Sequence, residues 1–106
     1  MKKATRAELE ELLTIYMNEL TTLVHKHLPG ATIYLFGSRA RKDYKEGADI
    51  DIAIQGNEPI PIDIISQLYN DLEETTIPVS VDFVDFNRTS PELIDRIKKE
   101  GFVWNK

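Results

Sequence analysis

Two carboxylates separated by one residue, Asp49 and Asp51, stand out in this sequence of 106 residues. They lie in the alternating segment ADIDIAI, and side chains two apart on a β-strand point to the same face of a sheet. Two carboxylates about 4 Å apart repel by roughly 4 kcal/mol at an effective dielectric constant near 20. A fold tolerates this repulsion when a cation lies between them or when one keeps a proton. Paired oxygen ligands suit Mg²⁺, which completes its coordination shell with water and substrate phosphates.

The dipeptide Gly37-Ser38 directly follows the β-branched and aromatic run TIYLF and precedes a short segment of helical character. Glycine lets a ligand approach the backbone closely, and free N–H groups at the start of a helix bind phosphate oxygens. We therefore predict a phosphate-binding turn, to which the Ser38 hydroxyl adds a contact. The structural alternative is a plain turn with a helix cap. The sequence offers Ser38 no convincing base partner, so we do not expect it to act as a nucleophile.

A third carboxylate, Asp82, interrupts the apolar segment VSVDFV at residues 79–84. Alternation places it on the face opposite to its two apolar neighbours, whereas Asp85 points the other way and is expected to cap the following turn. If this strand lies beside the first acidic strand, three carboxylates converge. A phosphate-binding turn that faces three carboxylates is the arrangement used for two-metal phosphoryl or nucleotidyl transfer.

Hydrophobic periodicity predicts the elements that position these residues. They are a helix from about Thr5 to Leu28, a strand over 32–36, a strand over 48–54, a helix from Pro61 to about Thr75, a strand over 79–84 and a helix from Thr89 or Ser90 to Gly101. Residues 102–104 are apolar enough to pack back on the domain. Strands that alternate with helices predict an α/β or α+β fold, a small mixed sheet flanked by helices, in one domain spanning 1–106. The first helix, about 36 Å long at 1.5 Å per residue, is expected to extend past the core and offer a surface to a partner.

The composition excludes several classes of protein. Eighteen acidic and thirteen basic residues give a net charge of -5, which argues against general electrostatic binding of nucleic acid. The absence of cysteine excludes disulfides, thiolate metal sites and cysteine nucleophiles. Because neither a membrane-spanning run nor a secretion signal is evident, we expect a soluble, cytoplasmic protein. We expect His25 and His27, on the first helix, to lie at the surface, with His27 able to reach the core.

Gly37-Ser38, ten further residues and then Asp49-x-Asp51 resemble the signature of the DNA polymerase β-like nucleotidyltransferase superfamily. The wider segment GSRARKDYKEGADIDIAI looks like the minimal nucleotidyltransferase (MNT) group, whose members pair with HEPN-domain proteins. The resemblance covers nearly the whole chain. It implies that Gly37 and Ser38 hold the triphosphate, that Asp49 and Asp51 bind two Mg²⁺ ions, and that Asp82 is the third metal-binding and catalytic carboxylate.

Four positions near the motif bear on this resemblance, two of which match the family and two of which depart from it. Arg39 and Arg41 match arginines of the family and are expected either to contact phosphates or a partner, or to form structural ion pairs. Lys42 stands where many members have glycine, and Ala48 where many have serine. Neither change removes a metal ligand, but both bear on the shape of the loop over residues 42–48.

The resemblance also implies a reaction. MNT proteins are antitoxins that transfer AMP from ATP to a tyrosine of a HEPN ribonuclease toxin, and a chain of this size has no room for an acceptor-binding domain of its own. We therefore expect a HEPN-domain partner and a nucleoside triphosphate, without direct binding to nucleic acid or membrane. One alternative is a binding module that neutralises a HEPN protein by contact alone. Another is a receiver domain, against which the Gly-Ser turn and the lack of a matching lysine strand both count. The choice of nucleotide base is not encoded in the motif.

Overall fold

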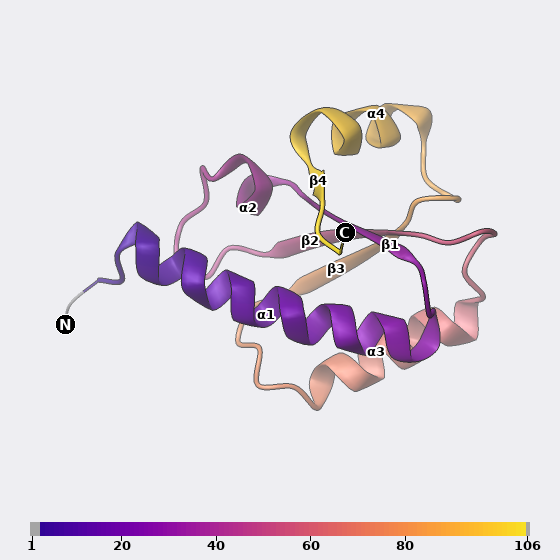
Figure 1. Cartoon of the computed structure of the whole chain (residues 1–106), viewed down its shortest axis with the longest axis horizontal. Helices are drawn as coiled ribbons and strands as arrows, with labels where there is room; N and C mark the ends of the chain where they lie inside the picture. Colours follow the sequence, from indigo (N-terminus) through magenta and orange to yellow (C-terminus); the bar gives the residue numbers. More distant parts are fainter. Residues whose placement is uncertain (1–2, 106) are drawn as a thin grey trace.

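The computed structural model describes residues 3–105, which form helices α1 to α4 and strands β1 to β4 (Figure 1). In chain order these are α1 (Arg6–His27), β1 (Thr32–Phe36), α2 (Ser38–Arg41), β2 (Ile50–Gln55), α3 (Ile62–Glu73), β3 (Val81–Asp85), α4 (Pro91–Glu100) and β4 (Phe102–Val103). The predicted mixed sheet flanked by helices is confirmed, and the element boundaries differ from the predicted ones by three residues or fewer.

The four strands form one sheet in the order β3-β2-β1-β4. β1 pairs with β2 and with β4 in antiparallel fashion, whereas β2 and β3 are parallel. The parallel pair requires a crossover connection, which α3 provides. The apolar C-terminal segment, which we expected only to pack back on the domain, adds β4 to the sheet, with Leu35 paired to Phe102.

Helices cover both faces of the sheet. Isoleucines of β2 at positions 50, 52 and 54 are fully buried in a core shared with α1 and α3, which lie side by side across one face (Figure 1). On the other face, Ile97 of α4 packs with Phe36, Ala53 and Phe86. Strand alternation therefore places the side chain of Asp51, like that of Ala53, on the face that α4 covers.

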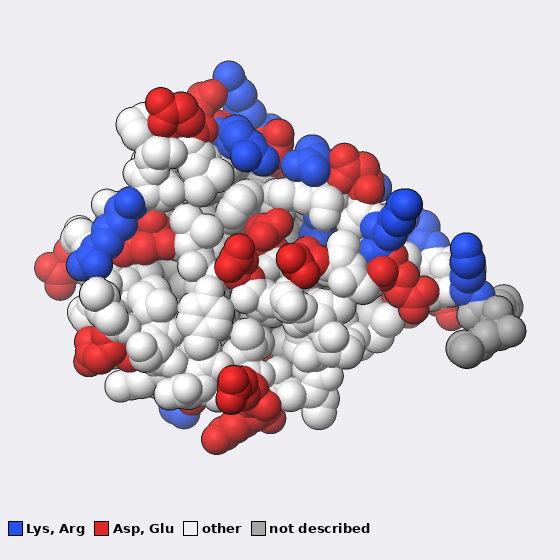
Figure 2. Space-filling view, turned by 180° about the vertical axis from the view of Figure 1, so that it is seen from behind, with Lys and Arg blue, Asp and Glu red and all other residues white. Residues whose placement is uncertain are grey.

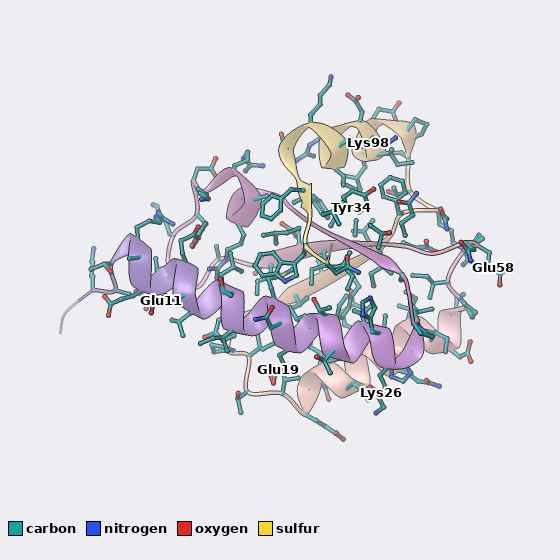
Figure 3. All side chains as sticks on the ribbon, viewed as in Figure 1. Glu11, Glu19, Lys26, Tyr34, Glu58 and Lys98 are labelled. Atoms are coloured by element: carbon teal, nitrogen blue, oxygen red, sulfur yellow. The ribbon has the colours of Figure 1, made fainter. Side chains whose placement is uncertain are left out.

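α1 follows the predicted pattern and ends where the sequence indicates. Thr5 caps its N-terminus in a reciprocal capping box with Glu8. Its polar face, which includes Glu11, Glu19 and Lys26, points to solvent (Figure 3). The N-terminal turns extend beyond the sheet, as expected, but they also support the loop over residues 42–48, because an Arg6 guanidinium nitrogen donates to the Tyr44 carbonyl at 2.8 Å.

None of the helices between residues 3 and 105 combines the length and apolar character that crossing a membrane requires. Both helical histidines are half-buried rather than at the surface. His25 lies 3.0 Å from the Ala31 carbonyl oxygen, and His27 lies 2.6 Å from a carboxylate oxygen of Asp71 on α3. These residues therefore tie the end of α1 to its surroundings and take no part in the acidic motif.

Candidate active site

The acidic motif is assembled by the parallel pairing of β2 with β3. Asp51 lies directly opposite Asp82 in the register, and Asp49 immediately precedes β2. Asp49 and Asp82 are exposed, whereas Asp51 is half-buried. Viewed from the side opposite to Figure 1, acidic side chains gather in the middle of the molecule, below a row of basic and acidic side chains (Figure 2). The two acidic segments are thus neighbours, which is the condition under which the three carboxylates converge.

Burial and neighbouring charges disfavour the ionised form of Asp51. Burial raises its pKa above the ordinary aspartate value, and the charges of Asp82 and Asp49 raise it further. Arg41 and Arg96 act in the opposite direction. Because the charged form of Asp51 is disfavoured by its like-charged neighbours, a cation bound among these carboxylates would stabilise the site.

Gly37 brings the backbone of the Gly-Ser turn against Asp51. Its φ of 73° and ψ of -158° lie in a region that is essentially restricted to glycine. A Cβ added at this position would overlap the Asp51 carboxylate. The glycine is therefore required both by the backbone conformation and by the close approach of β2.

Ser38 begins α2, a helix of one turn. The amides of Ala40 and Arg41 donate to the Gly37 carbonyl at 3.1 and 3.0 Å. The amides of Ser38 and Arg39 precede this turn, and amides at such positions have no partner within the helix. The turn after β1 therefore presents backbone donors next to the acidic strand, which fits the predicted contact with phosphate oxygens.

Arg39 is buried and holds the loop that precedes the acidic strand. Its side chain is buried, with 4% exposure, and its guanidinium donates twice to the Ala48 carbonyl, at 2.7 and 3.2 Å. It also lies 4.4 Å from the centre of the Tyr44 ring. The role of this arginine is structural, but it rests on a backbone carbonyl rather than on the expected ion pair, and its donors fix the loop that leads into Asp49.

The two residues that depart from the family pattern, Lys42 and Ala48, both lie in the loop over residues 42–48. Lys42 has a φ of 66°, a left-handed conformation that favours glycine, which explains the glycine common at this position in the family. Ala48 stabilises the loop through its backbone, because its carbonyl oxygen accepts a hydrogen bond from Arg39. Tyr44 anchors the middle of the loop, with its hydroxyl hydrogen-bonded to Glu10 of α1.

Arg41 remains accessible, with 38% of its side chain exposed. Its guanidinium forms ion pairs with Asp43 and Glu100, both at 3.0 Å. It therefore lies at the border of the site, where it influences Asp51. The sequence analysis missed Glu100, which pairs with Arg41 from α4, and Arg96, which pairs with Glu100 on the same helix. The signal was their spacing of four residues on one helix, which places them on the same side.

The donor set suits a hard divalent cation. Within residues 3–105, no three histidine, cysteine, aspartate or glutamate side chains are drawn together as a complete set of metal ligands. Nevertheless, the charges of Asp82 and Asp49 both act on Asp51, and carboxylate oxygens with water and phosphate are the ligands that Mg²⁺ prefers. Asp49, Asp51 and Asp82 are the residues that would hold such an ion.

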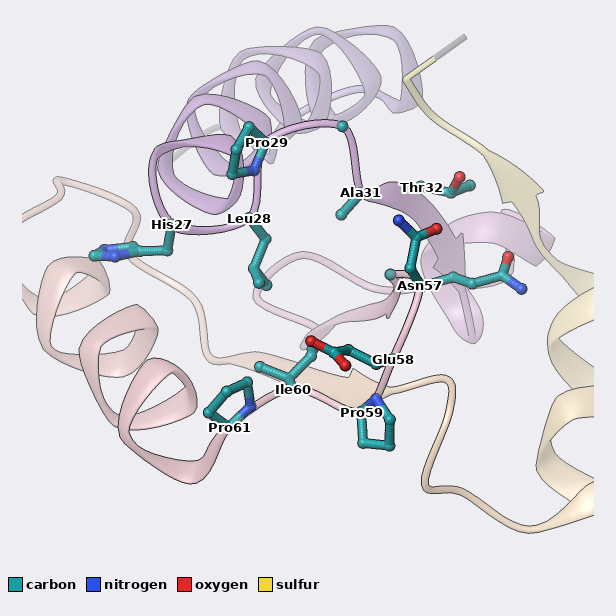
Figure 4. A pocket seen from close by; sticks show the side chains of 13 residues that line it. His27, Leu28, Pro29, Ala31, Thr32, Asn57, Glu58, Pro59, Ile60 and Pro61 are labelled. Carbon is teal, nitrogen blue, oxygen red and sulfur yellow. The ribbon is translucent and has the colours of Figure 1, made fainter.

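A hollow of about 520 Å³ lies at the opposite end of the sheet (Figure 4). Its lining includes the start of β1 at Thr32 and the end of β2 at Gln55, whereas the acidic motif lies where β1 ends and β2 begins. Glu58 is the one carboxylate among its lining residues. The hollow lacks the cluster of carboxylates that the predicted chemistry requires, and we therefore place the candidate site at the acidic motif.

A small mixed sheet with an acidic strand beside a Gly-Ser turn and a short helix is the arrangement that the resemblance to nucleotidyltransferases led us to expect. Comparison with known families supports this class, because residues 18–104 match the family described as "Polymerase beta, Nucleotidyltransferase". The chain belongs to this family. The minimal nucleotidyltransferase resemblance seen in the sequence is thereby confirmed, with the relatives described next.

Individual relatives agree with this assignment. The chain is 31% identical over 78 residues to the "Probable protein adenylyltransferase MntA" of Haemophilus influenzae, an alignment that spans 74% of this chain and 68% of the relative. A toxin-antitoxin crystal structure with AMP-PNP superposes with a TM-score of 0.72 and 26% identity, over 84% of this chain and 73% of the other. A complex of tri-AMPylated Shewanella oneidensis HEPN toxin with MNT antitoxin gives a TM-score of 0.68 and 25% identity, over 88% and 72%.

Proposed function

We propose that this protein is an antitoxin that transfers AMP from ATP to a tyrosine hydroxyl of a HEPN-domain toxin. The observation that carries the proposal is the register of β2 and β3, which sets Asp51 opposite Asp82 beside the Gly37 turn. The similarity to an MntA protein adenylyltransferase and to the AMPylated HEPN complex supports the choice of nucleotide and acceptor.

The reaction needs an acceptor oxygen in line with the α-phosphorus of ATP. The new bond joins the tyrosine oxygen to this phosphorus, the bond between the α-phosphorus and the bridging oxygen breaks, and pyrophosphate leaves. We assign to Asp82, which is exposed, the task of orienting the incoming hydroxyl and accepting its proton. Two Mg²⁺ ions held by the three carboxylates would supply neutralisation of the charge on the entering and leaving oxygens.

The remaining site residues bind and orient the nucleotide. We assign the triphosphate to the backbone amides after Gly37, to the Ser38 hydroxyl and to Arg41. Arg39 contributes indirectly, because its two bonds to Ala48 hold the loop that leads into Asp49. Since ATP is a cytoplasmic metabolite, we propose that the reaction takes place in the cytoplasm.

The acceptor is expected to come from the partner. Leu12 and Ile15 of α1 are exposed by 41% and 61%, and apolar side chains of this size at a surface are suited to contact with another protein. The same residues would also serve a module that neutralises its partner by contact alone, so the decisive test is chemical.

The test combines this protein with a purified HEPN-domain protein from the same source, Mg²⁺ and ATP labelled at the α-phosphate. We expect label on the partner, located on a tyrosine by peptide mapping, and no label when ATP carries it only at the γ-phosphate. An Asp49→Asn/Asp51→Asn variant serves as the inactive control. If this variant neutralises the partner as well as the unaltered protein does, with no AMP on the partner, the function is contact alone.

A further inference from the structure

The C-terminal helix α4 approaches the candidate site in a fixed orientation. Ile97 is fully buried against Phe36 and Ala53 of the sheet. Gly101, directly after the helix, has no room for a side chain, because a Cβ there would lie 2.6 Å from the Leu35 carbonyl oxygen and 2.7 Å from that of Ile97. The end of α4 is therefore pressed onto the end of β1, next to the turn at Gly37.

This orientation places a carboxylate between two guanidinium groups. Glu100 Oε2 lies 3.0 Å from Arg41 Nη1 and 3.8 Å from Arg96 Nη2. Arg41 comes from α2 and Arg96 from α4, so the bridge joins the helix that follows the Gly-Ser turn to the helix that covers the acidic face. The three side chains are 38%, 60% and 31% exposed for Arg41, Arg96 and Glu100, respectively, which leaves both guanidinium groups open to solvent.

The acidic side chain of Glu100 does not stabilise α4. Glu100 is the last residue of the helix, where the helix dipole disfavours an acidic side chain. The order Arg96 then Glu100 is also the weaker orientation for an ion pair four residues apart. The pair of Asp95 with Lys99, at 2.9 Å on the same helix, has the favourable order. A placement that opposes local preference is expected at functional sites.

We propose that Arg96, together with Arg41, binds the triphosphate of the incoming nucleotide, and that Glu100 neutralises these two arginines only until the nucleotide takes its place. This inference rests on the proposed nucleotidyl transfer. ATP adds several negative charges to a site that already holds three carboxylates, so cationic groups are needed at its border. Guanidinium groups bind phosphate oxygens in a bidentate manner, whereas an exposed ion pair such as that of Arg96 with Glu100 contributes little.

The electrostatics of the acidic face agree with this placement. Arg96 acts on the Asp51 carboxylate in the same direction as Arg41 and lowers its pKa. The charge of Arg96 on α4 thus acts on the acidic site. Lys99, which pairs with Asp95 at 2.9 Å, provides a control of the same charge on the same helix.

The test measures nucleotide affinity without a partner, by titrating AMP-PNP with Mg²⁺ into the purified protein in a calorimeter. We expect Arg96→Gln to weaken binding by about tenfold or more, the usual size of a lost hydrogen bond to a charged group. We expect Glu100→Gln to bind as tightly as the unaltered protein or more tightly, and Lys99→Gln to bind as the unaltered protein does. Partial recovery of affinity in Arg96→Lys would support a direct charge contact.

A purely structural role for Arg96 predicts different affinities for these variants. If Arg96 served only to hold Glu100, Arg96→Gln and Glu100→Gln would change affinity equally, and this result would overturn the inference. Equal affinity of Arg96→Gln and Lys99→Gln for AMP-PNP would overturn it as well. In either case the proposed transferase function would stand, provided that the unaltered protein binds AMP-PNP. Failure of the unaltered, folded protein to bind AMP-PNP would refute both proposals together.

Discussion

Replacement of Gly37 by alanine tests the contact between the Gly-Ser turn and the acidic strand. The backbone at Gly37 has a φ of 73° and a ψ of -158°, and placing an L side chain in such a conformation costs of the order of 1–3 kcal/mol. Each kcal/mol lowers the melting temperature of a domain of about 100 residues by roughly 5 °C. The added Cβ would in addition overlap the Asp51 carboxylate, so this side chain must move away from its position opposite Asp82.

Two other glycines allow the cost of backbone strain to be separated from the effect of overlap with Asp51. Gly30 and Gly47 have φ angles of 83° and 85°, and a Cβ added to either would meet nothing within 4 Å. Gly30→Ala and Gly47→Ala are therefore expected to lose about 1–2 kcal/mol from backbone strain alone. Gly30→Ala, far from the acidic motif, is expected to keep full transfer activity.

The assay compares urea unfolding with the rate of AMP transfer to the partner, at a temperature where every variant is folded. Gly37→Ala is expected to lose more stability than Gly30→Ala and to lose transfer activity by about a hundredfold, the effect that small misplacements of catalytic groups can have. A folded Gly37→Ala variant with the stability and activity of Gly30→Ala would refute the argument that Gly37 positions Asp51.

Three further predictions follow from the site and its loop. Asp51→Asn is expected to abolish transfer yet raise the melting temperature at pH 7 without Mg²⁺. Because the pKa of Asp51 is raised in the folded protein, ionisation of this carboxyl destabilises the native state as pH rises above about 4, and a pH series should show the gain of the variant shrinking as pH falls toward about 4 and vanishing below that value. Lys42→Gly is expected to stabilise the protein by about 0.5–1 kcal/mol in urea unfolding, because the left-handed backbone costs lysine more than glycine, and a loss of stability would contradict the assigned conformation. Arg39→Met is expected to lose about 2 kcal/mol through the lost bonds to Ala48 and to speed proteolytic cleavage of the loop over residues 42–48, whereas unchanged cleavage would show that this arginine does not hold the loop.

Local sequence patterns predicted most of the elements because they depend on nearby residues. The alternation around Asp49 and Asp51 predicted a strand, and the structure contains β2 from Ile50. The helix starts predicted at about Thr5 and at Thr89 or Ser90 agree with the structure, in which Thr5 and Ser90 are the N-caps. The short strand β4 was missed as a strand, because two residues are too few for a periodic signal and their pairing partner is remote in sequence.

The roles of the arginines could not be predicted from sequence. Arg39 and Arg41 have the same charge and lie two residues apart, but one is buried under the loop and the other is exposed at the border of the site. The difference arises because a helix turns by about 100° per residue, so that neighbouring positions face different surroundings. Only the packing of the loop and of α4 decides what those surroundings are.

The sequence by itself determined the groups that are available: a Gly-Ser turn, two carboxylates at and just before the start of one strand, and a third carboxylate in another strand. Tertiary structure decided which of these groups meet. The crossover through α3 sets β3 parallel to β2 and brings Asp82 opposite Asp51, and the burial of Ile97 carries Arg96 and Glu100 to the same face. Side-chain type and local spacing are written in the chain, whereas contacts between distant segments depend on how the buried apolar faces pack together.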